Sequence, residues 1–203
     1  MHIVCSDLEG VFVPEIWVNV SIHTGIDELK LTTRDISDYN VLMKRRLELL
    51  RKYGLTLRDV QNVISLLKPL PGALEFIDWL RSKTQLIIVS DTFSEFADPL
   101  IRQLGRPTLL CHHLTTDKEG NITDYNLRQE DAKMHVVKAL QDLNYKVVAI
   151  GDSYNDISML RKAEYAILYN PPQNVADEHK DLQVVKTYAS LKRTISQLLN
   201  GEE

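Results

Sequence analysis

Short apolar runs alternate with amphipathic stretches along this chain, and three of the runs end at a polar residue. Ile3-Val4-Cys5 leads to Asp7, Leu86-Ile87-Ile88-Val89 leads to Ser90, and Val147-Val148-Ala149-Ile150 leads to Gly151-Asp152. Apolar runs of this length between helical stretches are typical of buried strands in βαβ units. The sequence therefore predicts an α/β fold with a Rossmann-like parallel sheet and helices on both faces.

A long helical insertion is expected after the first strand. The predicted strands are residues 2–8, 85–90, 107–111, 146–151, 165–169 and 182–185. Between the first and second of these strands, the apolar residues follow a helical period in residues 15–25, 38–53 and 56–68, and Thr56 is the expected N-cap of the last helix. Pro69 and Pro71-Gly72 end this pattern, and a further helix is expected to about residue 82. We therefore expect a small helical cap, residues 15–70, inserted into a core domain of residues 1–14 and 71–203.

The second half of the chain contains a hairpin signal among further helices. Glu119-Gly120-Asn121 lies between Leu114-Thr115-Thr116 and Ile122-Thr123, a pattern that predicts a β-hairpin. Helices are expected at residues 130–143, 155–163 and 189–199, and a loop at Asn170-Pro171-Pro172.

Composition excludes several classes of partner. A net charge of −4 over 203 residues gives no basic field for nucleic acid. No apolar run approaches the ~20 residues of a membrane helix, and the first residues lack the pattern of a signal peptide. Cys5 and Cys111 fit buried thiols in a reducing compartment. We therefore expect a cytoplasmic protein without a nucleic-acid or membrane partner, and a homodimer remains open.

The polar residues at the strand ends form the constellation of a phosphotransferase. Asp7, Ser90 and Asp152 should converge, because ligands of parallel sheets bind at the carboxyl ends of the strands. Phosphoryl transfer needs a nucleophile, charge neutralisation and a proton donor. We expect Asp7 to form an aspartyl-phosphate, and Glu9 to protonate the leaving alkoxide and then activate the acceptor. Ser90 and Lys133 are expected to bind the phosphoryl oxygens.

The same constellation predicts a magnesium site. Mg²⁺ favours carboxylate, carbonyl and water oxygens, which Asp7 and Asp152 can supply with their side chains and Glu9 with its backbone carbonyl. Asp156, four residues after Asp152, can ligate the metal directly or orient a bound water. Gly10 allows a tight turn and a close approach of the backbone to phosphate.

Other classes of protein fit these residues less well. Each residue alone also suits an ordinary turn, a helix cap or a surface position. A signalling receiver module also uses Asp, a hydroxyl and Lys around Mg²⁺, but its phosphoacceptor lies on a later strand and it lacks an insertion like 15–70. An inert binding protein would be expected to lack a motif residue, and none is missing. Residue chemistry alone thus indicates a Mg²⁺-dependent aspartyl phosphotransferase with a capped site.

These motifs resemble the haloacid dehalogenase superfamily over nearly the whole chain. The position of the helical insertion is similar to the cap of its phosphoserine phosphatase branch, and residues 39–50 resemble the cap helix that holds substrate there. The resemblance implies that Arg46 pairs with the phosphoserine carboxylate and Glu15 with its amino group. It also implies phosphate or substrate contacts for Ser90, Lys133 and Asn155.

Three departures narrow the resemblance. Glu9 replaces the usual Asp of that branch, Gly10-Val11 replace Ser-Thr, and Asp91-Thr92 replace glycines. They look like the phosphoserine:homoserine phosphotransferases, which pass the phosphoryl group to homoserine and can also hydrolyse phosphoserine. The segments that fit are residues 7–11, 14–17, 33–36, 90–93 and 151–156. The resemblance implies that phosphoserine and homoserine are substrates and that Asp91 lies in the substrate site. A plain phosphoserine phosphatase, with water as the acceptor, remains the alternative.

Overall fold

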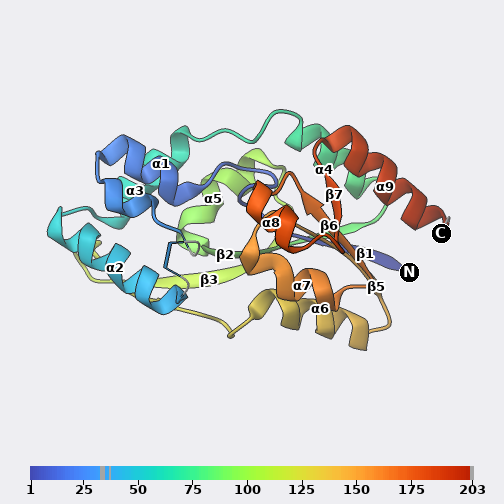
Figure 1. Ribbon diagram of the computed structural model, residues 1–203. Helices are drawn as coiled ribbons and strands as arrows, with labels where there is room; N and C mark the ends of the chain where they lie inside the picture. The colour runs from blue at the N-terminus through green and yellow to red at the C-terminus, as the bar shows by residue number, and fades with distance from the viewer. Residues whose placement is uncertain (33–34, 37, 202–203) are drawn as a thin grey trace.

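The computed structural model describes residues 1–32, 35–36 and 38–201, and its centre is a seven-stranded sheet (Figure 1). The strand order is β4-β3-β2-β1-β5-β6-β7, and all neighbours are parallel except the antiparallel pair β3 and β4. The bounds are β1 His2–Ser6, β2 Gln85–Phe93, β3 Thr108–Thr116, β4 Ile122–Asn126, β5 Lys146–Gly151, β6 Tyr165–Tyr169 and β7 Gln183–Val185. The chain order reverses at β1, which is where parallel sheets of this kind bind their ligands.

Both faces of the sheet are buried under helices. Along β1, Val4 packs into one hydrophobic cluster while Ile3 and Cys5 pack into another, because successive side chains of a strand point to opposite faces. The first cluster is covered by α4 Ala73–Arg81, α5 Ser94–Gln103 and α9 Tyr188–Asn200. The second is covered by α6 Ala132–Asp142, α7 Ile157–Lys162 and α8 Gln173–Glu178. The predicted α/β fold with helices on both faces is therefore confirmed.

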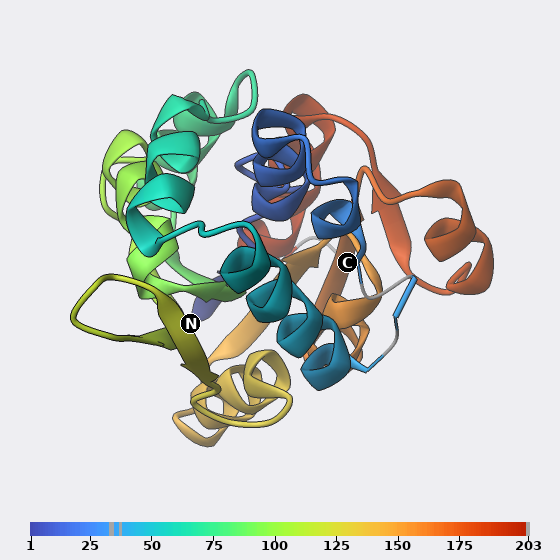
Figure 2. The same ribbon diagram turned by 90° about the vertical axis from the view of Figure 1, so that its left-hand side faces the viewer.

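Helices fill the described part of the chain between β1 and α4. They are α1 Ile16–Thr24, the 3₁₀ helix η1 Asp27–Lys30, α2 Tyr39–Lys52 and α3 Leu57–Leu66. Thr56 caps α3 as predicted, in a reciprocal capping box with Asp59. Figure 2 looks onto this segment, with the β3–β4 hairpin beside α2.

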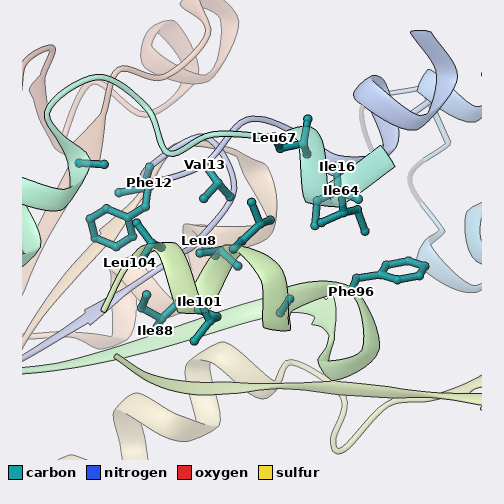
Figure 3. Packing of buried hydrophobic residues seen from close by; sticks show 14 of the residues in the cluster. Leu8, Phe12, Val13, Ile16, Ile64, Leu67, Ile88, Phe96, Ile101 and Leu104 are labelled. Atoms are coloured by element: carbon teal, nitrogen blue, oxygen red, sulfur yellow. The ribbon is translucent and has the colours of Figure 1, made fainter. Parts of the chain in front are cut away.

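One hydrophobic cluster runs from the sheet into α1, α2 and α3. Figure 3 shows Ile16 and Ile64 of these helices in the same cluster as Leu8, Ile88 and Phe96. Helix α2 reaches β4 through Tyr125, whose hydroxyl donates to the Asn40 side chain at 2.6 Å. The helical segment therefore packs against the rest of the molecule through apolar contacts of α1, α2 and α3, and through a polar contact at the start of α2.

The structure changes several predicted boundaries. The first strand ends at Ser6, because the amides of Phe12 and Val13 both donate to the Leu8 carbonyl and turn the chain. The second strand continues to Phe93 and the third to Thr116, where it forms the predicted hairpin with β4. Three elements were not predicted: η1, α5 and α8. Three apolar residues of the helical stretches predicted from periodicity are exposed: Ile22, Val41 and Leu66.

None of the helices in the described part of the chain combines the length and the apolar character needed to cross a bilayer.

Candidate active site

The carboxyl ends of β1, β2 and β5 bring the expected residues together. Asp7 follows β1, and its backbone N–H donates to the Ile150 carbonyl of β5 at 2.9 Å. Ser90 and Asp91 lie in β2, and Asp152 follows β5. Asp7, Ser90, Asp91 and Asp152 line one cavity. The predicted convergence of Asp7, Ser90 and Asp152 at one edge of the parallel sheet is therefore confirmed.

An irregularity in β2 lifts its polar residues out of the ladder. Val89 pairs with Leu110 and Phe93 pairs with His112, so four steps along β2 face two steps along β3. The extra residues form a bulge at Ser90, Asp91 and Thr92, a feature often found next to functional sites. Inside it, the Thr92 amide donates to the buried Ser90 hydroxyl at 3.2 Å.

Lys133, at the start of α6, is the cation at the centre of the site. Its Nζ lies 2.7 Å from Asp156 Oδ1, 3.0 Å from Asp7 Oδ1 and 3.4 Å from Asp91 Oδ2. The side chain is only 2% exposed. Burial alone lowers the pKa of Lys133, but the three carboxylates outweigh burial and hold that pKa well above its ordinary value. Lys133 therefore stays charged and holds the buried acids together.

The Asp156 side chain holds the loop after β5 through hydrogen bonds. Its Oδ1 accepts from Lys133, and its Oδ2 accepts the backbone N–H groups of Asp152 at 2.9 Å and Ser153 at 3.1 Å. A Cβ on Gly151 would lie 2.3 Å from the Asp156 Cβ, so this packing requires glycine. Both oxygens of the fully buried Asp156 carboxylate are thus engaged within the protein.

A second glycine makes room for Asp152. Gly10 has φ +75°, and a Cβ there would lie 2.4 Å from Asp152 Oδ2. The positive φ fits the tight turn predicted at Gly10, and the missing Cβ makes room for the Asp152 carboxylate. The predicted approach of this backbone to phosphate stays a prediction.

The acidic cluster has the donor set of a hard cation. Asp7, Asp152 and Asp156 each offer a carboxylate oxygen, all within 4.8 Å of one another, and all three residues are buried. Burial and the negative charges of Asp156 and Asp152 raise the pKa of Asp7 well above its ordinary value, although Lys133 opposes them. Like charges at this distance are stabilised by a cation, and carboxylate oxygens without a thiolate favour Mg²⁺ over soft metals. The residues present fit a magnesium ion.

Glu9 connects the loop after β1 to α1. Its Oε2 accepts the Ile16 backbone N–H at 2.7 Å, at the N-terminus of α1 where a carboxylate is favourable. Two effects raise the pKa of Glu9 to about 7: burial, which is the larger, and the negative charge of Glu15. A carboxyl group with this pKa can both give and take a proton near neutral pH. The bond to Ile16 was not expected from the sequence.

The expected substrate residues of the helical segment reach the same cavity. Glu15 and Arg46 line it together with Asp7 and Glu9. Arg46 is 7% exposed, and its guanidinium lies 4.6 Å from the centroid of the Trp17 ring. Arg46 also donates to the Leu31 carbonyl at 2.8 Å, whereas its buried Nε has no hydrogen-bond partner among the described residues.

Sequence reasoning assigned no role to three neighbours of these residues: Trp17, Tyr39 and His112. Trp17 stacks with Arg46, and the Tyr39 hydroxyl donates to the Asp91 carbonyl at 3.0 Å. Asn155 donates to Asp91 Oδ2 at 2.7 Å.

Of the segment 33–36, Thr33 and Arg34 lie outside the described residues, and Asp35 accepts the Thr32 N–H at 2.9 Å.

Comparisons with known proteins find similar sequences over most of the chain. Residues 14–164 match the family model of the haloacid dehalogenase-like hydrolases. Phosphoserine phosphatase ThrH of Pseudomonas aeruginosa is 55% identical over 193 residues, which covers 95% of this chain and 94% of that protein. A phosphoserine phosphatase of Pseudomonas syringae pv. tomato is 52% identical over 202 residues, which covers 100% of this chain and 85% of that protein.

Solved structures show the same fold. The crystal structure of phosphoserine phosphatase in apo form has a TM-score of 0.75 at 22% identity, covering 91% of this chain and 94% of that one. A phospho-aspartyl intermediate analogue of phosphoserine phosphatase has a TM-score of 0.73 at 22% identity, covering 91% of this chain and 93% of that one. At this identity the likeness concerns the fold alone.

Proposed function

We propose that this chain, which belongs to the haloacid dehalogenase-like hydrolase family, transfers the phosphoryl group of phosphoserine to homoserine or to water. The observation that carries the proposal is that Asp7, held by Lys133, lines the same cavity as Arg46 and Glu15. A reacting carboxylate and a pair of groups suited to a zwitterionic amino acid therefore face one space. The relatives named phosphoserine phosphatase support the same substrate.

In the first half-reaction, Asp7 is the proposed nucleophile. Its carboxylate attacks phosphorus, the new bond makes an aspartyl-phosphate, and the bond from phosphorus to the serine oxygen breaks. Glu9 gives its proton to that leaving oxygen, in keeping with a pKa raised to about 7. Lys133 and the Ser90 hydroxyl bind the phosphoryl oxygens as negative charge moves onto them.

In the second half-reaction, Glu9 takes the proton from the hydroxyl of homoserine or from water. The acceptor oxygen then attacks phosphorus, and the Asp7 carboxylate is released. Phosphoserine and homoserine share an α-amino and α-carboxylate head, so Arg46 and Glu15 can hold donor and acceptor in turn. A bound carboxylate would also provide an acceptor for the buried Nε of Arg46, which finds none among the residues that the structure describes and is costly to leave unpaired.

We propose Asp7, Asp152 and the Glu9 backbone carbonyl as ligands of Mg²⁺, which supplies charge neutralisation for the transferring group. Asp156 is placed in a supporting role, because Lys133 and two backbone amides already occupy its two oxygens. Its contribution is to fix Lys133 and the loop that carries Asp152.

We also propose that the chain consists of a core domain, residues 1–14 and 71–203, and a helical cap, residues 15–70. The helical content of the described part of 15–70 supports it. The shared hydrophobic cluster means that the cap is not an independently packed unit. A cytoplasmic reaction is part of the proposal, since Cys5 and Cys111 are buried free thiols.

The test is a product analysis with phosphoserine and Mg²⁺, with and without homoserine. We expect inorganic phosphate in both reactions and phosphohomoserine only where homoserine is present. Asp7→Asn should lower both products by several orders of magnitude, because it removes the nucleophile. Phosphate without phosphohomoserine would favour the plain phosphatase, and turnover by Asp7→Asn within about tenfold of the unaltered protein would remove Asp7 from the mechanism.

A further inference from the structure

His112 lies next to the active site without belonging to any of its motifs. It is in β3 opposite Phe93, and its imidazole is only 3% exposed. The backbone N–H of Arg128 lies 3.1 Å from His112 Nδ1. A backbone amide can only donate, so Nδ1 accepts and the ring carries its hydrogen on Nε2.

That Nε2–H faces Asp91. His112 Nε2 lies 3.6 Å from Asp91 Oδ1, an electrostatic contact slightly longer than a hydrogen bond. The other oxygen, Oδ2, accepts from Asn155 at 2.7 Å and lies 3.4 Å from Lys133 Nζ. Three side chains from three separate elements therefore hold the two oxygens of one carboxylate.

The Asp91 carboxylate needs support on both sides. The terminal torsion of an Asp side chain is broad, so packing and hydrogen bonds must fix it. Asp91 is 30% exposed and lines two neighbouring cavities, which leaves room for it to rotate. A rotated carboxylate would release Asn155 and would remove an acid from Lys133.

We propose that His112 is a positioning residue that holds Asp91 in the orientation that places Lys133 and Asn155 for phosphoryl transfer. The consequence for catalysis rests on the proposed function, whereas the contact itself rests on the geometry of His112, Arg128 and Asp91. His112 acts through Asp91, so its effect should depend on that carboxylate.

Two substitutions separate the two ring nitrogens. His112→Asn keeps an oxygen that can accept from Arg128 but loses the donor toward Asp91, whereas His112→Gln places an amide N–H₂ near the position of Nε2. For phosphoserine hydrolysis we expect kcat to fall about tenfold in His112→Asn, with KM within about twofold, and kcat within about threefold of the unaltered protein in His112→Gln. Combined with Asp91→Asn, His112→Asn should change kcat by less than about twofold, because coupled residues are not additive.

Three results would overturn the proposal: equal losses in the two variants, additive losses with Asp91→Asn, or a His112→Asn protein with unaltered kcat. All variants are also assayed with p-nitrophenyl phosphate. Turnover of this ester but not of phosphoserine would contradict the proposed substrate, while the pattern among the variants would still decide the role of His112.

Nitrogen-15 NMR of the imidazole is independent of any substrate. We expect an Nε2–H tautomer whose shift changes in Asp91→Asn, and an Nδ1–H tautomer would contradict the proposal.

Discussion

The proposed recognition of the amino-acid head depends on single residues, and Arg46 is the clearest case. Its guanidinium is buried over Trp17 and lines the cavity that contains Asp7. Arg46→Ala should raise the KM for phosphoserine by more than about tenfold, since hydrogen bonds to charged groups contribute about 1.5–3 kcal/mol. The KM for p-nitrophenyl phosphate, which has no amino-acid head, should change by less than about threefold.

Arg45 provides the matched control, because it is the preceding residue of α2 and is exposed. Arg45→Ala should leave both KM values unchanged, as expected for an exposed residue. Steady-state kinetics with the two esters measures the difference. Equal losses for both esters in Arg46→Ala would show that Arg46 supports the packing of α2 and not the substrate head.

At this scale the sequence predicted which motif residues meet, because parallel strands bring their carboxyl ends to one edge. It did not predict their partners. The bond from Ile16 to Glu9 and the contact of His112 with Asp91 join residues 7 and 21 positions apart, through turns whose geometry no local pattern encodes. The stacking of Arg46 on Trp17 likewise depends on how α1 and α2 pack.

Among the elements, α5 is the longest helix that was not predicted from the sequence, and its internal Pro99 explains why. Proline lacks an N–H, so the Glu95 carbonyl one turn earlier loses its normal helical donor. Gln61 of α3 replaces that donor, with its side-chain Nε2 2.7 Å from the Glu95 carbonyl. The tertiary contact thus completes a helix that local rules would break, and it also ties α3 to α5.

Gln61→Ala should therefore lower the free energy of unfolding by about 1–3 kcal/mol, the cost of leaving a partly buried carbonyl unpaired. Asn62→Ala is the matched control, because Asn62 is exposed on the same helix. Urea denaturation of both variants measures the difference. In a Pro99→Ala background, α5 regains its own donor, so Gln61→Ala should cost less there. An equal cost in both backgrounds would contradict this explanation.

For the whole molecule, alternating strands and helices were enough to predict the layered architecture and the helical insertion between β1 and α4. They could not show that α1, α2 and α3 share one hydrophobic cluster with the sheet. Amphipathic periodicity identifies an apolar face but not the surface that covers it. The same limit explains Ile22 and Leu66, which fit a helical period and are exposed.

The stability of the whole molecule should depend on the proposed cation. Asp7, Asp152 and Asp156 place three carboxylates within 4.8 Å, so metal-free protein carries their mutual repulsion into the folded state. A ligand that binds only the folded state at a hundred times its Kd stabilises it by about 2.7 kcal/mol, so saturating Mg²⁺ should raise the Tm of EDTA-treated protein by several degrees.

Asp152→Asn should raise the Tm of the metal-free protein, because one negative charge is removed, and should lose most of the shift with Mg²⁺. Asp142→Asn, at the exposed end of α6, should retain the full shift. Calorimetry of the three proteins, with and without Mg²⁺, measures these shifts. A Mg²⁺ shift in Asp152→Asn as large as in the unaltered protein would place the cation elsewhere.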